Sequence, residues 1–274
     1  MRKKIKTLKV IIKEHGFLSI LLFLKYRLIQ ALLRFIGSSI RFDSRHDPVR
    51  SQIDTFFEEV NGLDRPRILE LGSRNISHKN MFNSYSEYVG FDINAGPHVD
   101  KVGDAHRLSD YFPPAHFDVV YAIAVFEHLA MPWKVVQEIN KVLKEGGLLF
   151  IFTHHTFPLH AEPWDFWRFS KSAFSTLLNA QTGFEIIDSA LGWPCLILPL
   201  ENAVSLKETH KHLSFMGITV LAKKKGDSDS SLNWKIEMKN TVEDSYPMNY
   251  LKEGKLDVFF EYLKDRKKTN KLKE

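Results

Sequence analysis

Cysteine is almost absent from this sequence, since Cys195 is the only one among 274 residues. A framework of disulfide bonds is therefore excluded, and we expect a protein of the reducing cytoplasm. The sequence also lacks a long apolar run. Near the N-terminus the charge-free stretch covers only residues 17–24, whereas a membrane-spanning helix needs about 20 residues. Lys25 and Arg27 follow without a small-residue cleavage site, so the segment does not fit a signal peptide either.

A basic face suited to nucleic acid is missing as well. The net charge is +5, but the basic residues gather near the two ends of the sequence, and the charges in the middle are nearly balanced. The sequence shows neither a basic face with interleaved aromatic residues nor a known nucleic-acid-binding module, so we expect no nucleic-acid partner. The pattern gives no indication of the oligomeric state.

The first 45 residues predict a basic amphipathic helical extension. Lysines crowd its start, and the apolar stretches 17–24 and 28–36 are punctuated by Arg27 and Arg34. Two interpretations stay open. Apolar stripes on helices usually pack against a core, which favours an extension that lies on the main domain. The cations beside the apolar face fit a segment on an anionic membrane surface, which would make the protein peripheral at the inner face of the membrane.

Strand and helix patterns alternate from residue 65 onward. Helical periodicity covers residues 132–144, with Gly146 available to cap the end, and residues 170–180, with a serine at the first position as an N-cap. Such alternation predicts an α/β fold, with a mostly parallel twisted sheet and helices on both faces. The expected strands are the apolar segments 67–72, 88–93, 117–125, 148–155, 183–190 and 217–225.

Three regions are therefore expected along the chain. Residues 1–45 are the helical extension, and residues 46–225 are the α/β domain. Residues 226–274 are a linker and a C-terminal helical tail, because the alternating pattern weakens there.

The first expected strand leads into a turn typical of nucleotide-binding sites. In RILELGSRNIS, residues 67–77, an apolar run reaches an acid, Glu70, and then Gly72. A dinucleotide fingerprint would continue with further glycines, and here Ser73, Arg74 and Asn75 follow. The turn alone leaves three interpretations: an altered dinucleotide site, a site for a different nucleotide, or a strand and a turn without a ligand.

Acidic residues at later strand ends favour a nucleotide. Asp92 ends the second expected strand, 20 residues after Gly72. A carboxylate there can accept hydrogen bonds from the ribose hydroxyls of a nucleotide that lies across the strand ends. Asp104 and Ala105 end a short third strand, where an adenine ring would lie.

Residues 65–224 resemble class I S-adenosylmethionine-dependent methyltransferases, in particular the group known as type 11. The resemblance rests on ELGSRN, GFDI, GDAH and the long block FDVVYAIAVFEHL…VLKEGG, and this block is the most specific part. It implies the Rossmann-like class I methyltransferase fold and S-adenosyl-L-methionine as the cofactor, with Glu70 and Gly72 shaping the methionine end. The expected cofactor contacts are Glu70, Gly72, Ser73, Asp92, Ile93, Asp104, Ala105 and Ala122.

The missing glycines fit this cofactor. Extra glycines let the backbone approach a pyrophosphate closely. S-adenosylmethionine carries a sulfonium and an amino acid in that region and no phosphate, so the Ser-Arg-Asn turn is costlier for NAD than for this cofactor. The turn is therefore interpreted as part of a site for a nucleotide without a pyrophosphate.

The methyl acceptor should lie beyond the carboxyl ends of the fourth and fifth strands. If the acceptor is an alcohol, its proton must leave, and a histidine is the natural base because its ordinary pKa lies near working pH. We expect His154 to be the base, or else His128, although each could be a hydrogen-bonded scaffold residue. The aromatic residues of PWDFWRF could stack on a sugar or anchor a lid. The expected acceptor contacts are Glu127, His155, His160, Trp164, Asp165, Trp167 and Arg168.

No metal site is expected from the sequence. His154, His155 and His160 do not follow a ligand spacing that we recognise. The carboxylate cluster that suits Mg²⁺ is not apparent either.

The sequence thus predicts an S-adenosylmethionine-dependent methyltransferase for a small-molecule or glycan acceptor. O-methylation of a sugar or a lipid-linked saccharide is the first expectation. Two alternatives stay open: C-methylation of a quinone-like lipid, and a non-catalytic methyltransferase-fold protein that binds a nucleotide or a partner. The reduced glycine motif favours the non-catalytic protein, whereas Asp92, Asp104 and the histidines weigh against it.

Overall fold

The computed structural model describes three main stretches of the chain, residues 46–161, 163–198 and 212–229, and a few single residues. The chain divides into two compact units, Met1–Asp43 and Ser44–Glu274. Most of the expected N-terminal extension and nearly all of the expected C-terminal tail lie outside the described residues. In the part of the chain that the structure describes, no helix is long and apolar enough to cross a membrane. The single described residues are Leu28, Ala31, Leu32, Phe35, Thr209, Ser231 and Leu232.

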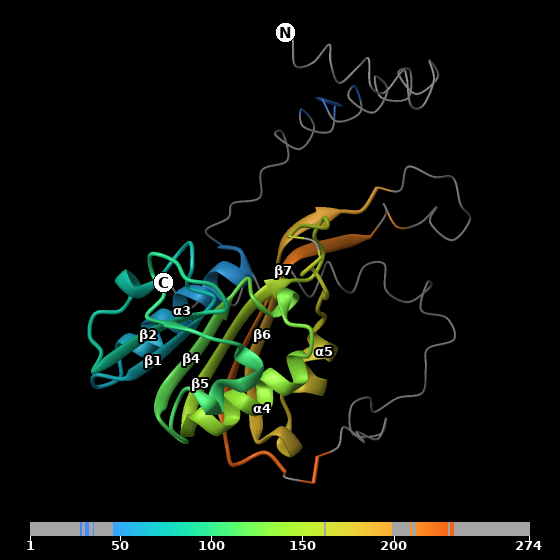
Figure 1. The fold of residues 1–274 in the computed structure, drawn as a ribbon. Helices are drawn as coiled ribbons and strands as arrows, with labels where there is room; N and C mark the ends of the chain where they lie inside the picture. The colour runs from blue at the N-terminus through green and yellow to red at the C-terminus, as the bar shows by residue number, and fades with distance from the viewer. Residues whose placement is uncertain are drawn as a thin grey trace. The chain divides into compact units, whose positions relative to one another are not determined.

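One sheet organises the second unit. Its strands, within the described residues, are β1 (Arg67–Leu71), β2 (Glu87–Asp92), β3 (Lys101–Val102), β4 (Phe117–Ile123), β5 (Leu143–His154), β6 (Phe184–Leu196) and β7 (Leu213–Lys224). The strand order is β3-β2-β1-β4-β5-β7-β6. Figure 1 shows the sheet with most of its strands labelled. β7 runs antiparallel to β5 and β6, and the other neighbours are parallel. The expected mostly parallel sheet is confirmed.

Helices cover both faces of this sheet. On β4, Val119 and Tyr121 pack in one apolar cluster and Val120 and Ala122 in another, because successive residues of a strand point to opposite faces. Helix α3 (Pro48–Asn61) packs in the first cluster, where its Phe56 ring stacks on Phe150 of β5 with centroids 4.4 Å apart. Helices α4 (Pro132–Val142) and α5 (Lys171–Leu177) pack in the second.

Helix α4 ends earlier than its periodicity predicts. Its last residue is Val142, and Leu143 already pairs with Phe117 as the first residue of β5. The prediction that Gly146 caps the helix is therefore wrong. Gly146 has φ +78°, and it lies where the register between β4 and β5 shifts, a conformation that glycine adopts without strain. The predicted serine cap of α5 is confirmed, since Ser170 accepts a hydrogen bond from the Ala173 amide at 3.2 Å.

The alternation of strands and helices fails between β1 and β2. In residues 72–86, all of which are described, the chain forms a single 3-10 turn, Lys79–Met81, and no α-helix. The segment is rich in serine and asparagine, whose side chains compete for nearby backbone groups. Ser77, for example, accepts a hydrogen bond from the Lys79 amide at 3.2 Å. The edge of the expected nucleotide site is consequently a loop.

Candidate functional site

The turn after β1 meets the loop after β4 at the carboxyl edge of the sheet. Gly72 has φ +82°, and its amide donates to the Phe91 carbonyl at 2.8 Å. A Cβ atom at this glycine would lie 2.2 Å from a methyl group of Val125. Both the backbone conformation and the close contact therefore require glycine here.

Asp92 is the carboxylate at the end of β2. One of its oxygens accepts a hydrogen bond from the Asn94 amide at 2.9 Å, and the other accepts one from the Arg74 amide at 3.3 Å. Each carboxylate oxygen can accept a further hydrogen bond. The backbone thus fixes the orientation of Asp92 and leaves acceptor capacity for a ligand's hydroxyl groups.

Asp104 lies just beyond β3, the neighbour of β2. Its Oδ1 accepts hydrogen bonds from the His106 amide at 2.9 Å and from the His106 ring at 2.7 Å. Burial alone would raise the pKa of Asp104, but the bonds from His106 outweigh it and hold the pKa below its ordinary value. Two oriented carboxylates therefore stand at adjacent strand ends.

Glu70 is buried below this edge, with 2% of its surface exposed. Its carboxylate accepts hydrogen bonds from the Ser77 hydroxyl at 2.8 Å, the Tyr88 hydroxyl at 2.5 Å and the His78 amide at 3.2 Å. Tyr88 in turn lies 2.6 Å from the hydroxyl of Tyr121. The network ties the loop after β1 to the sheet.

A second buried glutamate, Glu127, lies beyond β4 in the 3-10 turn Phe126–His128. It is completely buried. The Thr153 hydroxyl of β5 donates to its Oε2 at 2.6 Å, while its Oε1 has no hydrogen bond of suitable direction. Two imidazoles approach Oε1, with Nε2 of His154 at 3.1 Å and Nε2 of His128 at 3.8 Å.

His154 is the last residue of β5 and lies largely below the surface. The Phe157 ring stacks on its imidazole with centroids 4.1 Å apart. Burial lowers the pKa of His154 although the nearby Glu127 carboxylate acts in the opposite direction. Its Nδ1 is buried and has no hydrogen-bond partner. The structure therefore places Nε2 of His154 against the Glu127 carboxylate at the carboxyl edge of the sheet.

The chain from residue 155 to 169, here called the His-Trp segment, folds back over these groups. The amides of Phe166 and Trp167 donate to the Glu127 carbonyl at 2.9 and 3.1 Å. Arg168 donates to both oxygens of Asp165, at 2.6 and 2.8 Å, and so closes the segment. The hydrogen bonds from Arg168 hold the pKa of Asp165 well below its ordinary value. Burial acts in the opposite direction and offsets only part of this effect.

Residues 69–151 match a family model described as a methyltransferase domain. The match spans β1 to β5 and includes the acidic strand ends described above. Residues 69–151 thus form a methyltransferase domain. None of the curated proteins searched matches the chain.

The fold of this chain is similar to the folds of several solved structures. The YcgJ protein of Bacillus subtilis is 16% identical, with a TM-score of 0.49 over 63% of this chain and 97% of its own. An S-adenosylmethionine-dependent methyltransferase of Archaeoglobus fulgidus is 14% identical, with a TM-score of 0.46 over 64% and 93%. One from Mesorhizobium loti is 15% identical, with a TM-score of 0.42 over 62% and 96%.

The residues present fit S-adenosylmethionine, the cofactor of the methyltransferase. The hydroxyl of Ser73 is buried without a hydrogen-bond partner next to the turn after β1. Ile93 is 53% exposed directly after Asp92, where an apolar side chain can cover a nucleoside. Ala105 begins the 3-10 turn that Asp104 caps. Ala122 is completely buried inside β4, so its side chain belongs to the core.

The acceptor residues expected from the sequence gather at the ends of β4 and β5. His128 donates from Nδ1 to the Trp164 carbonyl at 2.6 Å, and His155 donates from Nδ1 to the Phe169 carbonyl at 2.7 Å. Trp164, Phe166 and Trp167 keep exposed surface, whereas the Asp165 carboxylate is buried against Arg168. The sequence prediction missed Thr153, Phe157 and His106. Thr153 bonds Glu127 across 26 residues, whereas Phe157 and His106 contact the near neighbours His154 and Asp104.

We expect the stabilisation by Glu70 to disappear in acid. Burial would raise the pKa of Glu70, but hydrogen bonds from His78, Tyr88 and Ser77 outweigh it and hold the pKa below the ordinary value of 4.5. The unfolded chain then binds more protons, so the contribution is complete above that value and is lost as pH falls through the lower folded pKa. Urea unfolding of wild type and Glu70→Gln should give a difference in unfolding free energy that is constant above about pH 5 and narrows below it. A difference independent of pH would contradict this.

Proposed function

We propose that this methyltransferase transfers the methyl group of S-adenosylmethionine to a hydroxyl group of a small molecule or glycan, preferably a sugar or a lipid-linked saccharide. The observation that carries the proposal is the pair of His154 and Glu127, 3.1 Å apart, beside exposed aromatic side chains at the acceptor edge. A hydroxyl acceptor needs a proton acceptor, and an imidazole that a buried carboxylate orients can serve as one.

The proposed chemistry divides between the cofactor and the chain. Bound S-adenosylmethionine supplies a methyl group on a positively charged sulfur, and the acceptor oxygen must approach in line with the bond that breaks. Nε2 of His154 faces Glu127, so the partnerless Nδ1 is the nitrogen that accepts the hydroxyl proton as the new carbon–oxygen bond forms. Glu127 stabilises the resulting imidazolium, and Thr153 fixes Glu127 through the bond to Oε2.

Aromatic side chains of the His-Trp segment support a sugar acceptor. Trp164 is 55% exposed, and Phe166 and Trp167 also retain exposed surface. Aromatic rings stack on the apolar faces of sugars, and their exposure in a loop fixed by its own hydrogen bonds makes that contact available. With Asp165 and Arg168 engaged with each other, the aromatic rings become the main acceptor contacts.

Incubation with labelled S-adenosylmethionine and fractions of native lipids and glycans tests the proposal. Label should enter a saccharide fraction, and mass spectrometry of the released sugars should place the methyl group on oxygen. Label on a ring carbon of a quinone-like lipid would favour the alternative of C-methylation. Cofactor binding without transfer to any fraction would favour a non-catalytic protein.

The N-terminal segment adds a proposal about location, namely weak association of a cytoplasmic protein with an anionic membrane surface. Its support is the lysine-rich start of the sequence beside the apolar stretch 17–24. Each basic residue near an anionic surface contributes about 1 kcal/mol of attraction. The full chain should float with anionic vesicles but not with neutral ones, and less so at high salt. A variant with Lys3, Lys4 and Lys6 replaced by glutamine should float less. If the wild-type protein stays at the bottom of the gradient with both kinds of vesicle, membrane binding is excluded.

A further inference from the structure

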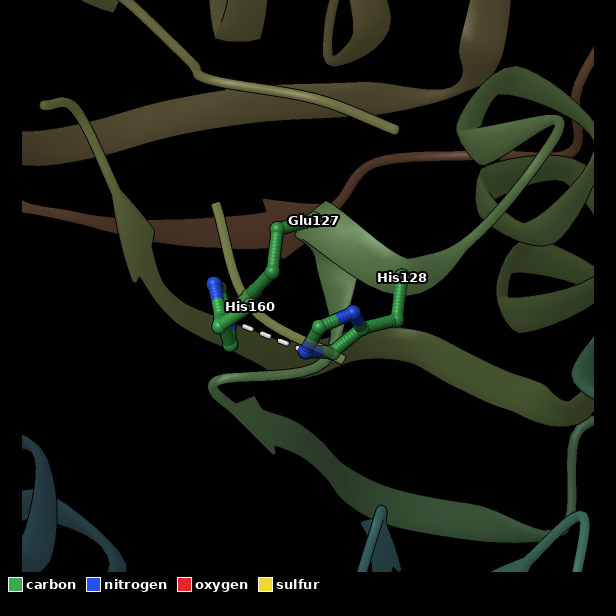
Figure 2. A group of neighbouring side chains, drawn as sticks. All are labelled: Glu127, His128 and His160. Atoms are coloured by element: carbon green, nitrogen blue, oxygen red, sulfur yellow. Dashed lines mark ion pairs between the residues drawn. The ribbon is translucent and has the colours of Figure 1, made fainter. Parts of the chain in front are cut away.

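Three side chains converge where the loop after β4 meets the His-Trp segment. Figure 2 shows Glu127, His128 and His160, and the dashed line marks the ion pair of 3.8 Å between Glu127 and His128. Each residue offers one carboxylate oxygen or ring nitrogen, and these atoms all lie within 4.8 Å of one another. Glu127 and His128 come from one turn, while His160 enters from a loop far along the chain.

The outer edges of both imidazoles are already bonded. Nδ1 of His128 donates to the Trp164 carbonyl at 2.6 Å, and a carbonyl can only accept. Nδ1 of His160 lies 3.2 Å from the Pro158 carbonyl and 3.4 Å from a carboxylate oxygen of Asp165. Because Nδ1 carries the proton in both rings, Nε2 of each neutral ring keeps a free lone pair. Metal-binding histidines are oriented in this way by carbonyl or carboxylate partners.

One oxygen of the Glu127 carboxylate has capacity for a further partner. Glu127 is completely buried, and its Oε1 has no hydrogen bond of suitable direction. Its Oε2 is held by the Thr153 hydroxyl, which leaves Oε1 as the atom that faces the imidazoles. This oxygen also lies 3.1 Å from Nε2 of His154, and a carboxylate oxygen that accepts from His154 still has a second lone pair to offer a cation.

We propose that Glu127, His128 and His160 bind one divalent transition-metal ion of the zinc class. Two imidazoles and one carboxylate suit zinc and its neighbours, whereas Mg²⁺ and Ca²⁺ prefer oxygen ligands. Three protein ligands leave a fourth position open, as in catalytic zinc sites. The acceptor hydroxyl could occupy that position next to His154.

Metal entry needs a small contraction of the cluster. Bonds of about 2.0–2.2 Å in a tetrahedral site place ligand atoms roughly 3.3 Å apart. His128 and His160 have 27% and 30% of their side-chain surface exposed, so both rings have room to turn toward Glu127. The proposal goes beyond the proposed function, since metal binding can be measured without an acceptor.

Metal titration of the full chain, prepared without a histidine tag and stripped with a chelator, tests the site. Calorimetry with ZnCl₂ and metal analysis after dialysis should give one tightly bound zinc per chain, and Co²⁺ should produce the visible absorption of a four-coordinate site. His128→Ala and His160→Ala should each lower the affinity by more than the roughly 10–100-fold that loss of an outer partner costs. His116→Ala, at the opposite edge of the sheet, should bind as the wild type does.

Two outcomes would overturn the metal site: a wild-type chain that retains no zinc, or His128→Ala and His160→Ala variants that retain it with wild-type affinity. Both histidines are partly exposed, and circular dichroism with thermal melting verifies that the variants fold. Failure here is distinct from failure of the proposed function. Zinc binding without methyl transfer would contradict the acceptor chemistry alone, and transfer by a chain that binds no zinc would contradict the metal site alone.

Discussion

Replacement of His154 by alanine should lower kcat for a hydroxyl acceptor by about 10²–10⁴-fold, the usual contribution of a general base. The variant keeps the strand-end acids, so its affinity for S-adenosylmethionine should equal that of the wild type. Its affinity for zinc should also persist, because Glu127, His128 and His160 remain. Single-turnover kinetics with the identified acceptor measure the first quantity, and calorimetry measures the other two.

The matched control for this prediction is His116→Ala. His116 precedes β4 at the amino edge of the sheet, where its ring contacts Glu87 at 2.7 Å. Loss of this imidazole should leave turnover unchanged. A His154→Ala enzyme that turns over at the wild-type rate would remove this histidine from the chemistry and direct attention to His128.

Asp92→Ala should nearly abolish binding of S-adenosylmethionine. The carboxylate is expected to accept two hydrogen bonds from the ribose hydroxyls, and bonds to a charged group contribute about 1.5–3 kcal/mol each. The backbone amides of Arg74 and Asn94 also lose their acceptor, so the turn after β2 becomes less well oriented. Calorimetry with S-adenosylmethionine and with its demethylated product should show the same loss for both ligands.

The control for the cofactor prediction is Asp64→Ala, because Asp64 is an exposed acid before β1 at the opposite edge of the sheet. This variant should bind the cofactor as the wild type does. NAD should bind to neither protein. Wild-type affinity in Asp92→Ala, or binding of NAD in place of S-adenosylmethionine, would refute the assigned role of this carboxylate.

Much of the fold could be predicted from the sequence because its signals are local. Buried strands show as apolar runs, and α4 shows the helical period, so element types follow from side-chain spacing alone. Boundaries depend on partners instead. Leu143 leaves the helical pattern because Phe117 on the neighbouring strand pairs with it, and a single sequence does not reveal that competition. The absent helix after β1 likewise depends on Ser77 and His78 bonding to buried Glu70.

Some residues of the candidate site could likewise be predicted from the sequence, and others could not. Asp92 and Asp104 could be predicted because parallel strands bring their carboxyl ends to one edge, so distance along the chain carries the information. His154 was expected to be the base from its place at a strand end, but its carboxylate partner could not be predicted by that route. His154 and His155 are adjacent in sequence, yet only His154 meets Glu127, while His155 bonds the Phe169 carbonyl. The cluster with His160 was also missed, because a loop brings it to Glu127 across more than 30 residues.

The loop after β1 has a consequence for the entropy of cofactor binding. A loop without helical hydrogen bonds would ordinarily lose conformational freedom when a ligand orders it, and that loss would weaken binding. Here Ser77 and His78 are bonded to the buried carboxylate of Glu70, so the loop loses this freedom when the chain folds. We therefore expect S-adenosylmethionine to meet a preorganised wall, and we expect the stability of the folded protein and the affinity for the cofactor to depend on the same buried side chain.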